Sequence, residues 1–432
     1  MSMKDFFIYV WIILEKGFDV MKEMVTLETK EANLTLEDVL QARKRIKDIC
    51  IDTELIYSSE YSMESGNQVY IKPENLQITG AFKLRGALNK ISKLSEDNKK
   101  KGLIASSAGN HAQGVAYAAN KLGIKATIVM PETTPLIKVQ ATKNYGAEVV
   151  LKGKVYDEAY DEAKRLEKEK GYTFIHPFDD LDVMAGQGTI ALEIIEKLKD
   201  VDAIVVPIGG GGLISGISVA AKSINPNIKI IGVQADGANP MKYSFDRGKL
   251  TSAEDIDTIA DGAAVKNPGK LTFQVIKKYV DEIVTVSDQQ LMEDVYILLE
   301  KHKLVAEATG AMSLAALNKL KFKNKKVVCL ISGGNIDVVT MSALLNHGLV
   351  SRGRIFCFSV KLKDTPGQLL QISKILAEKS ANIIKLDHNQ FKAIDRLKHV
   401  ALEVTVETNG HDHIEEIIKS LNEYGYNIEK VY

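Results

Sequence analysis

The stretch AIVVPIGGGGL at residues 203–213 decides the fold, because it runs from an apolar strand through four glycines into a helix. An unbroken apolar run of this length predicts a strand of a parallel sheet that is buried on both faces. Consecutive glycines each cost about 1 kcal/mol relative to alanine in ordered backbone, so something must approach the main chain closely. A phosphate at the N-terminus of the following helix is the natural candidate. The segment therefore predicts a phosphate-binding loop in an α/β protein.

The loop lacks the features of the common nucleotide-binding motifs. Ile214 or Ser215 stands where the third glycine of G-x-G-x-x-G would fall. The Gly-Lys pairs at 153–154, 248–249 and 269–270 do not continue into Ser or Thr, so a P-loop is absent from the sequence. A monophosphate is therefore favoured over a nucleotide pyrophosphate.

On both sides of this loop, short β-branched runs alternate with amphipathic helical stretches. Helices predicted at 112–122 and 156–170 are followed by Gly123 and Gly171, which suit left-handed C-terminal caps. Alternating strands and helices predict mostly parallel sheets that are covered by helices, and we expect this α/β body to span 34–349. The predicted strands are 69–72, 102–106, 126–130, 147–151 and 203–207.

After Gly353 the order of the elements changes. The pattern predicts a strand, a helix, two strands, a helix and a last strand, which is the βαββαβ order of a ferredoxin-like unit. We expect this unit to form a small domain over 354–432, joined to the body by a short linker at 349–353. Its predicted strands are 354–362, 381–386, 397–407 and 427–432, and its predicted helices are 364–379 and 411–424.

The first residues form the most hydrophobic stretch of the chain, FFIYVWIIL at 6–14. Nine apolar residues are too few for a membrane-spanning helix, which needs roughly 20, and the flanks do not resemble a signal peptide. We expect 1–33 to be an N-terminal extension, either disordered or the product of an upstream start codon.

Composition narrows the class of partner. Lys plus Arg and Asp plus Glu both number 56, so no net positive charge exists to hold nucleic acid or an anionic membrane. The chain has three cysteines, Cys50, Cys329 and Cys357. This odd number and the lack of any C-x-x-C spacing argue against a disulfide scaffold and against a cysteine zinc site. These features argue against nucleic acid and membrane as partners and favour a globular protein of the reducing cytoplasm.

A lysine is flanked by apolar residues in TGAFKLRGA at 79–87, immediately after a predicted helix start. The positive end of the helix dipole and desolvation by Phe82 and Leu84 both disfavour the ammonium form of Lys83. A free amine is what imine formation with a carbonyl requires. Taken alone, the segment is more typical of a lysine whose stem lies along the surface with its head in water.

Two further segments place polar groups at strand ends. ASSAGNHAQG at 105–114 runs from a strand through a glycine turn into a helix, and could seat a carboxylate or simply cap the helix with Asn110. VCLISGGN at 328–335 ends a buried strand in the neutral hydroxyl of Ser332. Together the segments supply an activated lysine, a carboxylate seat, a monophosphate seat and a hydroxyl, which pyridoxal phosphate with an amino-acid substrate requires.

This set resembles the fold-type II pyridoxal-phosphate enzymes over about 34–349, and within them the threonine/serine ammonia-lyases, or threonine dehydratases. GQGTIALE at 186–193 and the segment around Asp261-Gly262 add to the resemblance. It implies two α/β lobes, and it implies that Ser107, Asn110 and His111 receive the substrate carboxylate. It further implies an internal aldimine of pyridoxal 5′-phosphate on Lys83 and a contact of Asn110 with the cofactor's 3′-oxygen. It also implies a hydrogen bond from Ser332 to the pyridine nitrogen, and a phosphate site at Gly209, Gly210, Gly211, Gly212 and Leu213.

Departures from relatives refine the expected reaction. Serine racemases of this group carry a catalytic serine where this chain has Ala108, so proton return to the opposite face lacks a donor. Relatives that bind a divalent cation have acidic residues where Gln234 and Asn239 stand, and neutral amides are poor ligands for such ions. We therefore expect no metal site, although a monovalent cation held by carbonyls stays open.

The resemblance implies β-elimination from L-threonine, and also L-serine, to 2-oxobutyrate or pyruvate and ammonia. An amino-acid sensor that has lost catalysis and a racemase-like enzyme are the alternatives. The resemblance leaves open whether the reaction serves isoleucine biosynthesis or amino-acid degradation.

The C-terminal unit resembles an ACT domain through its element order and its D-x-P-G-x-L turn at 364–369. ACT domains typically pair and bind amino acids at the interface, which implies a homo-oligomer, dimer or tetramer, under allosteric control. A dimerisation module without a ligand is the alternative. The implied effector residues are Pro366, Gly367, Asn382 and Ile383.

Overall fold

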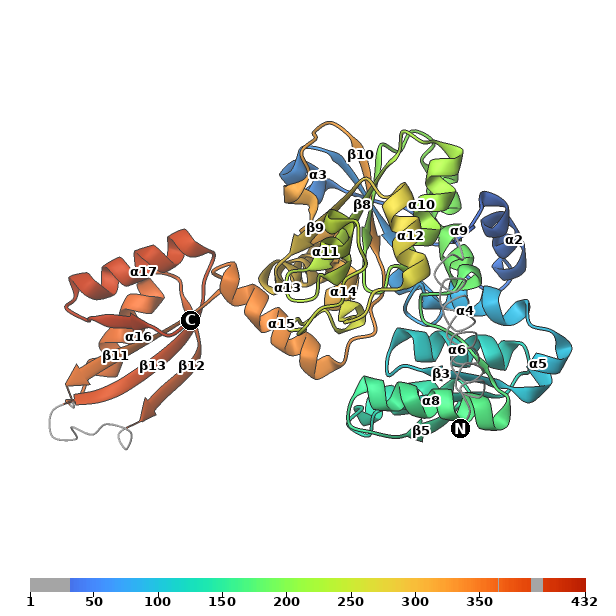
Figure 1. Cartoon of the computed structure of the whole chain (residues 1–432). Helices are drawn as coiled ribbons and strands as arrows, with labels where there is room; N and C mark the ends of the chain where they lie inside the picture. The colour runs from blue at the N-terminus through green and yellow to red at the C-terminus, as the bar shows by residue number, and fades with distance from the viewer. Residues whose placement is uncertain (1–31, 364, 390–398) are drawn as a thin grey trace, which may run out of the picture.

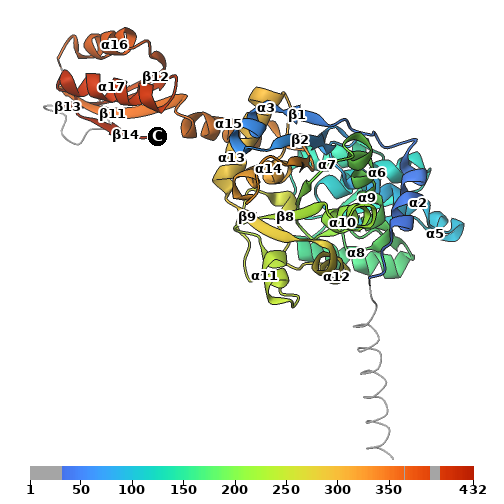
Figure 2. The same cartoon turned by 90° about the horizontal axis from the view of Figure 1, so that it is seen from above.

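The computed structural model describes residues 32–363, 365–389 and 399–432. Most of the expected N-terminal extension lies outside the described residues. The described chain forms a two-lobed body and a separate C-terminal domain, and α15 (Val338–Ser351) leads from one to the other (Figure 1). From above, the C-terminal domain again lies to one side of the body, beyond the end of α15 (Figure 2).

The larger lobe is built on a six-stranded sheet in the order β1-β2-β10-β7-β8-β9. β1 pairs antiparallel with β2, and the other strand pairs are parallel. The strands are β1 (Ile56–Ser58), β2 (Gln68–Pro73), β7 (Ala203–Pro207), β8 (Lys229–Ala235), β9 (Glu282–Val286) and β10 (Lys326–Ile331).

Helices and short helical turns pack around this sheet. The helices are α2 (Leu36–Ile46), α3 (Ser59–Ser65), α9 (Leu181–Lys197), α10 (Gly212–Ile224), α11 (Pro240–Arg247), α12 (Lys270–Tyr279), α13 (Asp288–Ile297), α14 (Ala308–Ala315) and α15. The turns are η1 (Glu74–Leu76), η2 (Asp261–Ala263), η3 (Leu298–His302) and η4 (Leu317–Lys319).

The smaller lobe holds a four-stranded parallel sheet in the order β5-β4-β3-β6. Its strands are β3 (Leu103–Ser106), β4 (Ala126–Met130), β5 (Glu148–Leu151) and β6 (Thr173–Phe174). Its helices are α4 (Lys83–Ser92), α5 (Glu96–Lys101), α6 (Asn110–Lys121), α7 (Leu136–Asn144) and α8 (Tyr156–Lys170).

These two lobes confirm the predicted α/β class with mostly parallel sheets. Each predicted strand of the body is present, and its ends differ from the prediction by at most one residue. Gly123 and Gly171 have φ values of +67° and +68°, which confirms both left-handed caps. A buried, β-branched strand and a glycine-capped helix are each specified by local residues, which is why the sequence predicts them well.

The C-terminal domain has a four-stranded antiparallel sheet in the order β12-β13-β11-β14, the ferredoxin-like arrangement. Its core contains Phe356, Phe358 and Ile417, all fully buried. The elements are β11 (Ile355–Lys363), α16 (Gln368–Glu378), β12 (Asn382–Asn389), β13 (His399–Glu407), α17 (His411–Glu423) and β14 (Ile428–Lys430).

The connection between body and C-terminal domain is shorter than the expected linker at 349–353. α15 continues to Ser351, and the chain turns at Gly353, which has a φ of +63°. The apolar run Leu349-Val350 contains no helix breaker, so the helix extends until the glycine ends it. Within the described part of the chain, no helix is both long and apolar enough to cross a membrane.

Candidate active site

A cavity of about 850 Å³ opens where the four sequence motifs meet, at the carboxyl ends of β3, β7 and β10. Parallel α/β sheets bind ligands at this edge, since the loops after neighbouring strands converge there. Every predicted cofactor and substrate residue lines the cavity: Lys83, Ser107, Asn110, His111, Gly209, Gly210, Gly211, Gly212, Leu213 and Ser332.

Lys83 is the first residue of α4 and projects its amine into this cavity. Its Nζ donates to the carbonyl oxygen of Pro177 at 2.9 Å and lies 5.1 Å from the ring centre of Phe82. Burial lowers the pKa of Lys83 to about 8, and the negative charge of Glu307 opposes that shift. The amine is therefore far more available at neutral pH than the amine of an exposed lysine.

The glycine loop forms another part of the wall, and α10 begins at Gly212. A Cβ on Gly210 would lie 2.3 Å from the ring of Phe178, and one on Gly212 would lie 2.8 Å from its carbonyl oxygen. Gly211 has a φ of +97°, a conformation that favours glycine. The close approach predicted for this loop is thus made by Phe178 of the protein itself, while the loop remains on the cavity wall at a helix N-terminus, where an anion is stabilised.

The loop after β3 carries the predicted carboxylate seat. The Ser107 hydroxyl accepts from the backbone N–H of Gly109 at 3.2 Å, so its own hydrogen stays available to a ligand. His111 is buried, and its Nε2 lies 2.9 Å from the carbonyl oxygen of Ile175. Burial lowers the pKa of His111 to about 3, so the imidazole is neutral and Nε2 carries the hydrogen. Nδ1 is then an acceptor, and only the backbone N–H of His111 can donate to a carboxylate.

Asn110 is held by two residues that sequence reasoning did not assign. Its Nδ2 donates to Glu307 Oε1 at 2.7 Å, and its Oδ1 accepts from Asn335 Nδ2 at 2.8 Å. Because an amide nitrogen carries two hydrogens, one N–H of Asn110 remains for a ligand in the cavity. Burial raises the pKa of Glu307 to about 7, and the charge of Asp261 adds to that shift. A single acidic residue in the run VAEATGAMS at 305–313 is the signal that could have identified Glu307.

Ser332 lies at the end of β10 and is 2% exposed. Its hydroxyl lies 3.5 Å from the carbonyl oxygen of Thr309, which also lines the cavity. Among the described residues, Ser106 Oγ, His111 Nδ1 and Thr309 Oγ1 are buried polar atoms of this wall without a hydrogen-bond partner. Buried polar atoms normally have partners, so these three indicate a polar ligand.

These groups fit pyridoxal phosphate. Lys83 offers an amine for its aldehyde, the loop at Gly209–Leu213 a seat for its phosphate, and Ser332 a neutral hydroxyl for its ring nitrogen. The volume of the cavity leaves room for an amino acid beside a cofactor of this size.

Of the two positions discussed for a divalent cation, Gln234 is engaged within the protein. Gln234 is fully buried, and its Oε1 accepts from the backbone N–H of Lys242 at 2.8 Å. Asn239 precedes Pro240, the first residue of α11. Over 32–363, 365–389 and 399–432, no group of three or more His, Cys, Asp or Glu side chains is arranged to hold a metal ion.

Comparison with known proteins agrees with this geometry. The profile of the family described as pyridoxal-phosphate dependent enzyme matches residues 46–333. The L-threonine ammonia-lyase of Thermotoga maritima is 49% identical over 399 residues, which cover 92% of this chain and 100% of that protein.

Solved structures give the same result. Processed threonine deaminase isoform 2 of Solanum lycopersicum superposes with a TM-score of 0.70 at 39% identity, covering 73% of this chain and 87% of that one. Maize serine racemase superposes with a TM-score of 0.70 at 34% identity, covering 74% and 98%. The lysine, the glycine loop and these matches lead to one conclusion: the chain belongs to the family of pyridoxal-phosphate dependent enzymes.

Proposed function

We propose that the chain is a threonine ammonia-lyase, which removes water from L-threonine and releases 2-oxobutyrate and ammonia, and which also converts L-serine to pyruvate. The observation that carries this proposal is the buried amine of Lys83, which faces the same cavity as the glycine loop and the neutral hydroxyl of Ser332. The relative from Thermotoga maritima, aligned along its full length, bears the name of this activity.

Each residue of the site has a distinct part in the reaction. Lys83 would hold the cofactor through its aldehyde, and its amine then takes the proton from the substrate's Cα. Bound pyridoxal phosphate supplies an electron sink for the pair of electrons left at that carbon. The β-hydroxyl receives that proton back from Lys83 and leaves as water, and the released enamine hydrolyses to the 2-oxo acid and ammonia.

Hydrogen-bond donors of the loop after β3 would orient the substrate. The Ser107 hydroxyl, the remaining N–H of Asn110 and the backbone N–H of His111 are the donors that can meet a carboxylate. Ser332 carries no charge, so it cannot keep the cofactor's ring nitrogen protonated. The electron pair is then less delocalised, which favours prompt elimination over transamination.

Replacing the lysine tests this proposal. Lys83→Ala should lower 2-oxobutyrate production from threonine by at least about 10⁴-fold, since the residue supplies both the covalent attachment and the base. Lys93→Ala is the matched control, because Lys93 is the residue that ends the same helix at its C-cap but pairs with Asp182 near the surface. Lys83→Ala with turnover close to the parent would refute the assignment, whereas loss in both variants would point to damage of the helix.

Racemisation is the second candidate, because a serine racemase is among the structural neighbours. Proton return to the opposite face of the cofactor needs a second base there, and Ala108 has no hydroxyl. The parent should release almost no D-threonine or D-serine, and Ala108→Ser should increase that release. Chiral chromatography of the products decides this, and abundant D-amino acid from the parent would overturn the argument.

A sensor without catalysis is disfavoured because Lys83 and Ser332 both line the cavity, where a sensor would not need them.

The C-terminal domain is proposed as the regulatory unit, with isoleucine or valine as the effector. Gly367 and Pro366 lie just before α16, at the end of the sheet where β11 finishes. Asn382 begins β12 and pairs with Glu407 of β13, and Glu407 also pairs with Ile355, the first residue of β11. Asn382 therefore lies at the other end of the sheet. Eight residue steps of strand separate the two ends, about 26 Å at roughly 3.3 Å per residue. A ligand that touches both Gly367 and Asn382 would therefore require two chains, which supports a homo-oligomeric enzyme.

We place this enzyme in the cytoplasm. The three cysteines are free and buried, and structural disulfides are rare in reducing compartments.

A further inference from the structure

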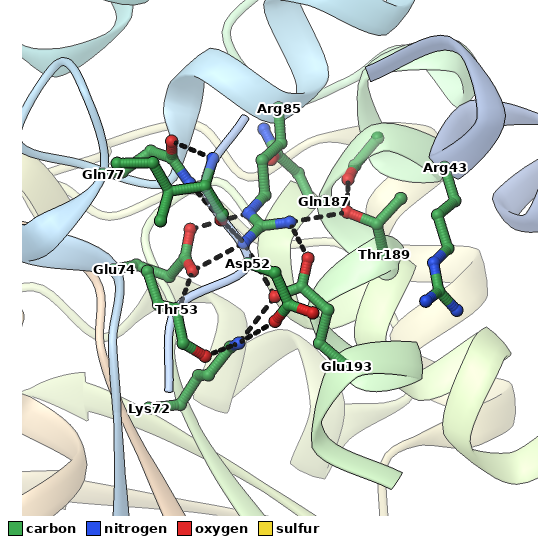
Figure 3. Close-up of polar contacts among 12 residues, drawn as sticks. Arg43, Asp52, Thr53, Lys72, Glu74, Gln77, Arg85, Gln187, Thr189 and Glu193 are labelled. Carbon is green, nitrogen blue, oxygen red and sulfur yellow. Dashed lines mark hydrogen bonds and ion pairs between the residues drawn. The ribbon is translucent and has the colours of Figure 1, made fainter. Parts of the chain in front are cut away.

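Arg85 follows Lys83 by two residues on α4 and is 1% exposed. Residues two apart on a helix point about 200° apart, so Arg85 faces away from the cavity into which Lys83 projects. All three guanidinium nitrogens donate hydrogen bonds (Figure 3). The acceptors are both carboxylate oxygens of Glu74, both of Glu193, the hydroxyl of Thr189 and the carbonyl of Ile51.

A second cation completes this network. Lys72 has no exposed surface, and its amine donates to Glu193 Oε2 at 2.5 Å and to the carbonyl of Thr53 at 2.6 Å. Lys72 and Arg85 balance Glu74 and Glu193, so four buried charges sum to zero. We call these four residues the Arg85 network.

Such a cluster is weak evidence for stability alone. Taking four charges out of water is expensive, and well-packed apolar residues would stabilise the fold as well or better. A buried ion pair does add geometric specificity, because a bidentate arginine fixes both the distance and the orientation of its partner carboxylates. The network joins α4, η1, β2 and α9, so it fixes the register of these elements (Figure 3).

The glycines of the same motif bring three helices into backbone contact. A Cβ on Gly186 would lie 2.5 Å from the carbonyl oxygen of Arg85, and one on Gly188 would lie 2.7 Å from that of Gly216. Helix α9 therefore packs directly on α4 through Gly186 and on α10 through Gly188. Since α4 begins at Lys83 and α10 begins at Gly212, α9 sets the spacing between the lysine and the glycine loop.

We propose that the Arg85 network is a positioning device, which holds the amine of Lys83 in register with the glycine loop of the cofactor site. The glycines allow the helices to approach, and the directional hydrogen bonds of Arg85 to Thr189 and Glu193 stop α4 from sliding or rotating on α9. GQGTIALE at 186–193 supplies Gly186, Gly188, Thr189 and Glu193, so one motif provides both the contact surface and the acceptors. This inference rests on the proposed function, because it takes Lys83 as the residue that captures the cofactor aldehyde.

A comparison of two aldehydes tests positioning apart from stability. Pyridoxal phosphate can use the glycine loop and Lys83 together, whereas pyridoxal lacks the phosphate and depends on the lysine alone. The full chain, freed of aldehyde, is mixed with each compound, and the adduct on Lys83 is trapped with borohydride and quantified by mass spectrometry. In the parent, pyridoxal phosphate should be captured much faster, since a seated phosphate places the aldehyde beside the amine.

Glu193→Gln should reduce this phosphate advantage by about tenfold or more, because a small displacement of the amine removes the benefit of the seated phosphate. Capture of pyridoxal should stay within about twofold of the parent. Glu196→Gln is the matched control, because Glu196 lies on the same helix and its ion pair with Arg43 is exposed. In this variant the capture rate of pyridoxal phosphate relative to that of pyridoxal should equal the parent's.

Several outcomes would overturn the proposal. An unchanged ratio of the capture rates of pyridoxal phosphate and pyridoxal in folded Glu193→Gln would do so. An equal fall in both capture rates would also do so, because it would show that the network only stabilises the fold. If Glu193→Gln does not fold, Thr189→Val decides, because it removes one neutral acceptor of Arg85 at 3.2 Å and should still lower the ratio about threefold. An unchanged ratio in Thr189→Val would then refute positioning. A parent that captures no pyridoxal phosphate would instead refute the proposed function.

Discussion

Lys83 and Glu307 face one cavity, and burial moves each toward its uncharged form. The pKa of Lys83 falls to about 8 and that of Glu307 rises to about 7, because neither charge is well solvated there. The site can therefore supply a free amine near neutral pH, and a carboxyl that exchanges its proton in the same range lies against Asn110. Such paired shifts are typical of groups that handle protons.

Glu307→Gln should lower the pKa of Lys83 further, because the carboxylate charge that stabilises the ammonium is removed. Trapping of the Lys83 adduct with borohydride, measured from pH 5 to 10, should show a midpoint at lower pH than in the parent. The amide oxygen of the variant can still accept from Asn110, so the geometry of the site is preserved. Glu254→Gln, at an exposed carboxyl of the cavity mouth, should leave the midpoint unchanged. A midpoint that rises in Glu307→Gln would contradict the interaction.

The sequence predicts residues of this site well where they stand in unusual local patterns. Lys83 between apolar neighbours and the four glycines after a strand are exceptions to plain core composition, so they are visible in one segment. Glu307 and Thr309 lie in a run of small residues that a buried helix would also show, and their role depends on Asn110 and Ser332 from distant segments. The tautomer of His111 also depends on a distant segment, because the carbonyl of Ile175 determines which ring nitrogen carries the hydrogen.

At the scale of elements, α13 carries a buried carboxyl that the proposed reaction does not use. Asp294 accepts from the hydroxyl of Tyr61 on α3 at 2.7 Å, and burial raises its pKa to about 7. In the unfolded chain this carboxyl titrates near 3.8. The folded chain therefore binds the proton more tightly, and its contribution to stability is complete below about pH 4 and is lost as the pH rises through 7.

Asp294→Asn should therefore stabilise the chain relative to the parent at pH 8 and have a smaller effect at pH 4. The shift of the pKa sets an upper bound of about 4 kcal/mol for the difference between the two pH values. Urea unfolding of both proteins at each pH measures it. Asp288→Asn on the same helix is the control, since Asp288 accepts from Thr258 near the surface. A larger stabilisation at pH 4 than at pH 8 would reverse the sign and refute the account.

The elements themselves follow from local sequence, whereas their partners do not. The strand that leads into the glycine loop is predicted from its own apolar residues, but its place between β10 and β8 depends on the whole sheet. In the same way, GQGTIALE is visible as a motif, while its contact with Arg85 requires the packing of α9 on α4.

At the scale of the whole molecule, the C-terminal domain lies beyond α15, to one side of the body (Figures 1 and 2), and none of its residues lines the cavity. An effector bound there must favour one of two states of the enzyme, and coupling of about 1 to 3 kcal/mol, or roughly 5- to 150-fold in affinity, is typical. Removal of the domain after Ser351 should abolish the response to isoleucine or valine and leave turnover by the body.

Gly367→Val should weaken the same response without changing turnover. Gly367 has a φ of +96°, a conformation that costs a β-branched residue about 1 to 2 kcal/mol, so the turn before α16 must change. Threonine saturation curves with increasing isoleucine or valine measure the effect. Gly123→Val is the control, because Gly123 has a φ of +67° and open space around it but lies in the body. An unchanged response in Gly367→Val would remove this turn from the effector site.

The opposite placement of Gly367 and Asn382 on one sheet has a consequence for mixtures of defective chains. If each effector site combines the turn of one chain with the strand start of another, two copies related by a twofold axis form two such sites. A chain with Gly367→Val, paired with a chain that carries Asn382→Ala, then forms one site with both defects and one site with none. Co-expression of two unresponsive enzymes should therefore restore part of the inhibition that each has lost alone, as complementing alleles do.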